Sequence, residues 1–187
     1  MSTKVKGDWK NMAKSGREQL AEDERKILSE LQKNSKENID TIAKHCGLSR
    51  QKVWRTINQL EKSGMIWGYT AIVDEDKNDL CHFIILIKRS IKSIDKKILN
   101  KIESMQLEDI GLPKGVNIES SCFVHGNYDW IISFTARDII QAKNFCDMLS
   151  GGFPEIIEKI DLQQTLYFVR KQHIFNPDRK TLYDLIS

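Results

Sequence analysis

The chain has 187 residues, with 29 Lys+Arg against 26 Asp+Glu and a formal net charge of +3. This length suits one medium domain or two small ones. No stretch approaches the ~20 apolar residues of a membrane-spanning helix, and the N-terminus lacks an apolar signal core, so a cytoplasmic protein is expected. The four cysteines, Cys46, Cys81, Cys122 and Cys146, form no C-x-x-C pair, and reduced thiols are expected.

Positive charge is concentrated in the first third of the chain. Residues 1–62 carry 14 Lys+Arg and 9 Asp+Glu, whereas residues 63–187 carry 15 and 17. An excess of cations attracts a polyanion, so this part is the expected nucleic-acid-binding half. Residues 1–19 form a basic mobile arm that either contacts DNA phosphates or is a plain disordered extension. A helix is predicted from Leu20 to Asn34, with Asp23 among the acids of its first turn that suit the helix dipole.

Residues 38–64, NIDTIAKHCGLSRQKVWRTINQLEKSG, predict two short helices joined by a tight turn. Asn38 is a suitable N-cap for the first helix, and Gly47 is a suitable C-terminal residue because glycine accepts left-handed backbone angles. Ser49 opens the second helix. This arrangement is typical of a helix-turn-helix, in which the second helix enters the major groove of DNA.

At 100° per residue, one face of the second helix is apolar and the opposite face carries cations and amides. Gln51, Arg55 and Asn58 are the candidates for contacts with base edges. Trp54 is expected to pack against a sugar or a thymine methyl group. Ser49, Lys52 and Lys62 are the candidates for phosphate contacts, with Arg50 as a weaker one.

After this motif, Gly64 to Val73 is predicted to form a short strand pair or wing, which completes a DNA-binding domain over residues 20–73. The polar stretch of residues 74–80 is the expected linker. The remaining pattern predicts βαββαβ over residues 81–171. Its elements are strands at His82–Arg89, Val116–Val124, Asp129–Thr135 and Lys159–Val169, and helices from Ser93 and from Asp138 to Leu149.

Two further features complete the prediction. A loop is expected at residues 107–115, and a C-terminal extension over residues 172–187 includes a short helix in the sequence DRKTLYDLI. Ile139, Ala142, Phe145 and Leu149 are expected to face inward from the second helix. The fold class is therefore α+β, with a three-helix, winged helix-turn-helix domain followed by a ferredoxin-like domain.

The first strand of this second domain is apolar on both faces, so each face requires cover. Leaving several Leu or Ile residues exposed would forfeit ~1.5–3 kcal/mol for each of them. A homodimer through the sheet is the expected solution, and it suits paired helix-turn-helix units on a two-fold DNA site.

The chain resembles the Lrp/AsnC family of prokaryotic transcription regulators in its order of domains and in two stretches of sequence, IAKHCGLSRQKVWRTINQLEKSGMIWGYTAIVD and HGNYDWIISF. The resemblance is specific in Ile66–Ala71 and in the turn Gly126-Asn127-Tyr128-Asp129. It implies dimers or higher assemblies, no cofactor, and a small-molecule effector such as an amino acid. By this likeness Gly126, Asn127, Tyr128 and Asp129 are the effector candidates, with Asp129 meeting an ammonium group. Alternatively, these residues form only a hairpin turn.

Two other functions are alternatives to regulation. Siroheme decarboxylases share this architecture and use the second domain for chemistry. The candidate catalytic residues here are His82, Arg89, His125 and Arg137, but the sequence places no two of them at a spacing that would form a general acid and base pair. A non-specific, chromatin-type DNA binder is a further alternative.

Metal binding and RNA binding are weaker hypotheses. Cys122 and His125 are predicted to point to opposite faces of a strand, as are Cys81 and His82, so no metal site is predicted. RNA binding would require exposed aromatic residues on the sheet, but Phe123, Trp130 and Phe134 have few cations nearby, and burial against a partner is expected. The expected function is sequence-specific DNA binding that regulates transcription, without enzymatic activity.

Overall fold

The computed structural model describes residues 21–90, residue 100 and residues 115–178. The predicted arm at residues 1–19, nearly all of the helix from Ser93, the loop at 107–114 and the C-terminal helix lie outside these residues. The chain divides into two compact units. The first unit comprises Met1–Ile72 and Arg170–Phe175, and the second comprises Val73–Val169 and Asn176–Ser187. The predicted linker, residues 74–80, falls at the start of the second unit and contains a single 3-10 turn, η1 (Asp76–Asn78).

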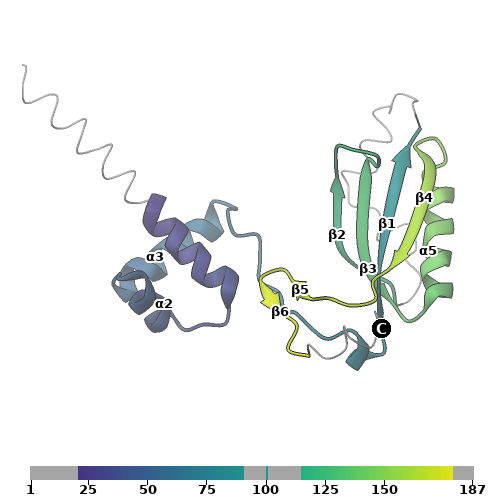
Figure 1. Ribbon diagram of the computed structural model, residues 1–187. Coiled ribbons are helices and arrows are strands. Elements are labelled where there is room, and N and C mark those ends of the chain that lie inside the picture. Colours follow the sequence, from purple (N-terminus) through teal and green to yellow (C-terminus); the bar gives the residue numbers. More distant parts are fainter. Residues whose placement is uncertain (1–20, 91–99, 101–114, 179–187) are drawn as a thin grey trace, which may run out of the picture. The chain divides into compact units, whose positions relative to one another are not determined.

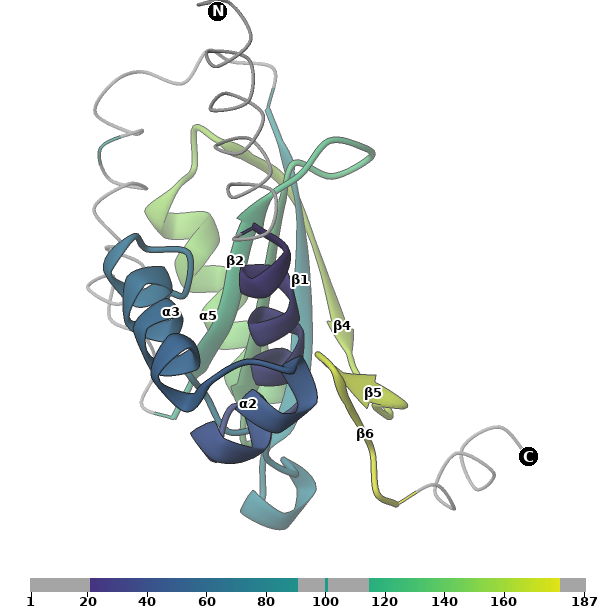
Figure 2. The same ribbon diagram turned by 90° about the vertical axis from the view of Figure 1, so that its left-hand side faces the viewer.

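Among its described residues, the first unit contains three helices: one over residues 21–33, α2 (Ile39–Cys46) and α3 (Arg50–Lys62) (Figures 1 and 2). The Asn38 side chain caps α2 by accepting a hydrogen bond from the Thr41 N–H at 2.8 Å. Gly47 ends α2 in the left-handed conformation, with φ at 67°. Ser49 caps α3 by accepting from the Lys52 N–H at 3.3 Å. The predicted helix-turn-helix and its caps are confirmed.

The three helices share a small apolar core. Its buried members are Ile27, Leu31, Ile42, Ala43 and Val53. They come from all three helices, and together with the partly buried Ile39 and Ile57 they follow i, i+3 and i+4 spacing, so each helix buries one stripe against the other two. The outer face of α3 is thereby left to solvent. None of the described helices is long and apolar enough to span a bilayer.

The predicted strand pair at residues 64–73 is wrong, because this segment contains no strand. A segment of alternating apolar and polar residues forms a β-strand only when a neighbouring strand supplies hydrogen-bond partners, and no other described segment pairs with this one. Trp67 is consequently 98% exposed. A two-stranded sheet occurs instead near the C-terminus, where β5 (Arg170–Lys171) pairs with β6 (Ile174–Phe175).

The second unit is built on a four-stranded antiparallel sheet in the order β2-β3-β1-β4 (Figure 1). In chain order its elements are β1 (Cys81–Arg89), β2 (Asn117–Phe123), β3 (Trp130–Ala136), α5 (Ile139–Gly152) and β4 (Ile157–Gln164). The strands and α5 follow the predicted βαββαβ order, whose first helix, from Ser93, lies almost entirely outside the described residues. The last strand starts two residues earlier than expected and ends five earlier. Its ladder with β1 ends at Phe83 opposite Gln164, although β1 continues to Cys81 and the Thr165 N–H still donates to the His82 carbonyl oxygen at 2.9 Å.

Helix α5 covers one face of the sheet. The core there includes Phe83, Ile85 and Ile87 from β1, packed with residues of β3 and α5. Ala142, Phe145 and Leu149 are buried as predicted, but Ile139 is 41% exposed. Ile139 is the first residue of the helix and lies at the edge of the inward stripe, so the prediction that it faces inward is wrong.

On the opposite face of the sheet, fewer apolar side chains occur than the sequence suggested. Ile84 and Leu86 of β1 and Ile131 of β3 are partly buried there. Their neighbours in β4 are polar, since Gln163 lies opposite Ile84 and Asp161 lies opposite Leu86. The expectation that apolar residues fill both faces therefore holds for β1 and only in part for the other strands.

Candidate nucleic-acid interface

The outward face of α3 carries exposed cations and amides above a buried apolar stripe. Val53, Thr56 and Leu60 are buried beneath it. Gln51, Arg55, Gln59 and Lys62 are exposed, and Trp54 is 55% exposed. Within the described part of the chain, no hydrogen bond or ion pair engages the side chains of Arg55 and Lys62. Two cations on a single face are therefore available to a polyanion.

These side chains surround an open hollow of about 440 Å³ on the surface of α3. Its lining residues are Trp54, Arg55, Asn58, Gln59 and Lys62. The Asn58 Nδ2 atom donates a hydrogen bond to the backbone carbonyl oxygen of Trp54 at 2.9 Å, which fixes the orientation of the amide. The hollow thus places an indole, two amides and two cations side by side on one helix.

The predicted phosphate contacts at the start of α3 already have partners. The Ser49 hydroxyl caps the helix, and the Arg50 Nη1 atom lies 3.2 Å from the Asp40 carboxylate of α2 in an exposed ion pair. The Lys52 ammonium forms an ion pair with Asp23 of the helix over residues 21–33. Lys52 can therefore contact a phosphate only by sharing or leaving Asp23.

Asp23 is only 2% exposed, and sequence reasoning missed its role. Its place in the first turn explains a favourable interaction with the helix dipole but does not explain its burial. A signal was nevertheless present, since Asp23 precedes Ile27 and Leu31 at i, i+4, i+8 spacing and so belongs to the buried stripe. A carboxylate in such a stripe needs a cation or several hydrogen bonds.

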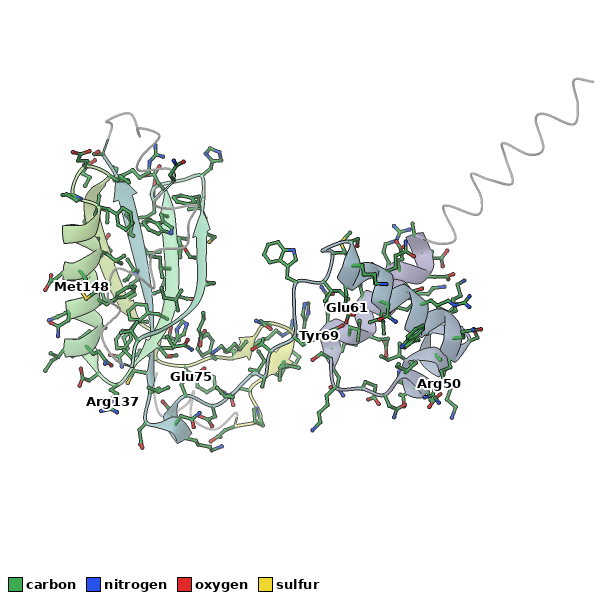
Figure 3. All side chains as sticks on the ribbon, turned by 180° about the vertical axis from the view of Figure 1, so that it is seen from behind. Arg50, Glu61, Tyr69, Glu75, Arg137 and Met148 are labelled. Atoms are coloured by element: carbon green, nitrogen blue, oxygen red, sulfur yellow. The ribbon has the colours of Figure 1, made fainter. Side chains whose placement is uncertain are left out.

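The single carboxylate on α3 is held at its C-terminal end. Glu61 accepts a hydrogen bond from the Tyr69 hydroxyl at 2.9 Å, and the two side chains lie close together in Figure 3. Partial burial and the nearby Glu61 carboxylate both raise the pKa of Tyr69. This contact joins the irregular segment after the helix-turn-helix to α3.

The predicted effector residues lie at the turn between β2 and β3, where two of their side chains stabilise the fold. The Tyr128 hydroxyl donates to the Asp161 carboxylate of β4 at 2.6 Å, and the Lys159 ammonium lies 2.9 Å from the same oxygen atom. One oxygen of Asp129 accepts from the Arg89 backbone N–H at 2.9 Å. Gly126 and Asn127 are exposed, and a side chain built at Gly126 would meet open space.

The four residues considered for decarboxylation do not come together. His82 and Arg137 lie at one end of the β1–β3 pair, whereas Arg89 and His125 lie at the other. His82 and Arg89 are seven residues apart along β1, which corresponds to roughly 23 Å at ~3.3 Å per residue. His82 is buried, with its Nδ1 atom 2.7 Å from the Thr165 hydroxyl. No group of three potential metal ligands occurs among the described residues.

The aromatic residues considered for RNA binding have different environments. Trp130 and Phe134 are buried in the core, where Trp130 packs edge-on against Phe153 and Phe134 packs edge-on against Phe145 of α5. They are therefore covered by their own chain, so the expectation of burial against a partner is wrong for these two. Phe123 is half exposed and stacks on Trp130.

Comparison with known proteins identifies relatives of both units. A family model for winged helix-turn-helix DNA-binding domains matches residues 24–66. The HTH-type transcriptional regulator PH0061 of Pyrococcus horikoshii is 32% identical over 120 residues, which cover 64% of this chain and 72% of that protein. The regulatory protein AsnC of Haemophilus influenzae is 34% identical over 120 residues, covering 63% and 73%.

The fold is also similar to solved structures. The complex of the transcriptional regulator NMB0573 of Neisseria meningitidis with L-Met superposes with a TM-score of 0.59 at 17% identity, covering 80% of this chain and 92% of that one. At this level of identity the likeness concerns the fold. It extends over both units, since neither unit alone accounts for four fifths of the chain.

Proposed function

The chain belongs to the Lrp/AsnC family of transcription regulators, and on that basis we propose which of its residues contact DNA and how its activity is controlled. As a member of this family it is a DNA-binding transcription regulator. The finer assignment concerns α3. We infer that Gln51, Arg55 and Asn58 contact base edges and that Lys62 and the helix start at Ser49 contact phosphates.

One observation carries this assignment: the cations of α3 that face away from the core are exposed and unpaired. Arg55 and Lys62 have no partner in the described residues, while Arg50 and Lys52 are each paired with a carboxylate. A protein releases counterions from DNA only through cations that its own acids do not neutralise. Arg55 and Lys62 are therefore expected to contribute more to DNA affinity than Arg50 and Lys52.

The test is a binding titration with labelled DNA fragments, among them the protein's own promoter, at several salt concentrations and with non-specific competitor. We expect a few fragments to remain bound in the presence of competitor, because specific contacts add typically 10³–10⁷ in affinity over non-specific binding. Uniform binding that is lost at modest salt would instead indicate a non-specific, chromatin-type binder and would contradict the proposal.

We further propose that the protein assembles as a homodimer through the face of the sheet that α5 leaves open. Ile84, Leu86 and Ile131 on that face are apolar and only partly buried. A second copy would cover them and would bring two α3 helices to DNA together. Half-sites about one helical turn of DNA apart, or a multiple of that distance, are then expected.

A small molecule with an ammonium group, such as an amino acid, is the proposed effector at residues 126–129. The Neisseria meningitidis regulator, which has the same fold, was solved as a complex with L-Met. In this chain one oxygen of Asp129 remains after the bond to the Arg89 N–H, and Gly126 leaves space beside the turn. Such a ligand would alter DNA affinity only if it favoured one assembly over another.

A further inference from the structure

Trp54 is unusual among the large apolar residues of α3 because it is exposed. Val53, Ile57 and Leu60 face or contact the helical core, whereas the indole of Trp54 is 55% exposed. Its Nε1–H has no hydrogen-bond partner in the described part of the chain. An indole in this position contributes little to packing, yet it presents a large apolar surface to whatever approaches α3.

The immediate neighbour of Trp54 on the surface is Asn58, four residues later. The Asn58 Nδ2 atom donates one hydrogen to the Trp54 carbonyl oxygen, which leaves its second N–H and its Oδ1 atom available. One N–H and one oxygen are what an amide needs to pair with N7 and N6 of adenine. Both residues line the same hollow, so an apolar wall adjoins an adenine-reading group.

We propose that Trp54 recognises the 5-methyl group of a thymine in an A·T base pair, while Asn58 contacts an adenine. Thymine is the only unmodified base that presents a methyl group in the major groove, and this methyl group is the natural apolar partner there. A contact of the indole with a sugar would be indifferent to that methyl group. The proposal rests on the proposed role of α3 in the major groove and adds the class of base pair that it selects.

The test uses the full-length protein and a DNA fragment that it binds specifically, with each thymine replaced in turn by deoxyuridine. This replacement removes one methyl group and leaves base pairing intact. We expect affinity to fall about fourfold at one position in each half-site, which corresponds to ~0.8 kcal/mol for one buried methyl-sized group. All other positions should tolerate the change.

Trp54→Ala should bind the thymine and deoxyuridine fragments equally, because the group that senses the methyl is gone. Trp54→Gln, which is compatible with the helix, should behave in the same way. The matched control is Trp67→Ala, which removes another exposed tryptophan from outside α3 and should retain the fourfold discrimination. Circular dichroism and thermal unfolding of each variant show that the helices are intact.

Two results would overturn the inference while leaving the regulator itself intact. The wild type could bind its fragment specifically yet tolerate deoxyuridine at every position, or Trp54→Ala could keep the discrimination. The wild-type measurement needs no variant, so a misfolded mutant cannot obscure it. If no fragment is bound specifically, the proposed role of α3 fails, and this inference fails with it.

Discussion

Lys52 on α3 forms an ion pair with Asp23, a buried residue of the helix over residues 21–33. The two residues are 29 positions apart in the chain. The contact therefore links α3, the helix proposed to contact DNA, to the helix over residues 21–33 and neutralises one of the cations of α3.

We expect Lys52→Met to lower the free energy of unfolding by about 1–3 kcal/mol, because the Asp23 carboxylate would stay buried without this cation. Urea unfolding measures the change. Lys62→Met is the matched control, since Lys62 is exposed and unpaired within the described residues, and its effect should stay within ~0.5 kcal/mol. Equal stability of the two variants would show that the pair contributes little to the fold.

Arg55→Ala should weaken specific DNA binding by about 1–3 kcal/mol and relax selectivity at one base position. Lys62→Ala should instead weaken binding to all sequences alike and reduce the slope of log affinity against log salt by roughly one. Titrations against a bound fragment and its single-base variants separate the two effects. If Arg55→Ala left specific binding unchanged, the proposed docking of α3 would be wrong.

Leu86→Glu should convert the proposed dimer to monomers at micromolar concentration. The new carboxylate would lie on the open sheet face directly opposite Asp161, where burial against a second copy would be costly. Sedimentation equilibrium gives the mass. The control is Ile140→Glu, which changes an equally apolar but exposed residue of α5, and the dimer should persist in this variant. An unchanged mass for Leu86→Glu would place the interface elsewhere.

Tyr128→Phe should raise the pKa of Asp161 toward its ordinary value. The Tyr128 hydroxyl and the Lys159 ammonium both lower this pKa by favouring the carboxylate, and the tyrosine is the larger cause. A lowered pKa in the folded state stabilises the protein above the ordinary pKa of the unfolded chain. This stabilisation disappears as the pH falls through the lowered value. Carboxyl NMR titration at acid pH is the measurement, with Tyr69→Phe as a control that leaves Asp161 untouched.

Cys146 should resist alkylation while Cys122 reacts. Burial raises the pKa of the Cys146 thiol to about 11, so only about one molecule in a thousand carries the thiolate at pH 8. Cys122 is exposed on β2 of the single chain and lies opposite Ile131 on the face proposed for the dimer, so the labelling uses the monomeric Leu86→Glu variant. Timed labelling with iodoacetamide followed by peptide mass spectrometry should find Cys122 modified first, and early modification of Cys146 would indicate that α5 opens readily.

The sequence by itself determined the features that depend on residues a few positions apart. Asn38, Ser49 and Asp138 cap helices through backbone groups three residues away, and Gly47 ends α2 through its own φ angle. The division of α3 into a buried and an exposed face follows from its period of 3.6 residues. For the same reason the motif that carries DNA binding could be recognised without a structure.

Tertiary structure alone decided which side chains meet across elements. The pairing of Lys52 with Asp23 and the bond from the Arg89 N–H to Asp129 join residues 29 and 40 positions apart. The length of β4, which ends at Gln164, was set by its pairing with β1. The burial of Trp130 likewise depends on α5 covering that face of the sheet. Local patterns give each residue a face, but packing between elements decides what that face touches.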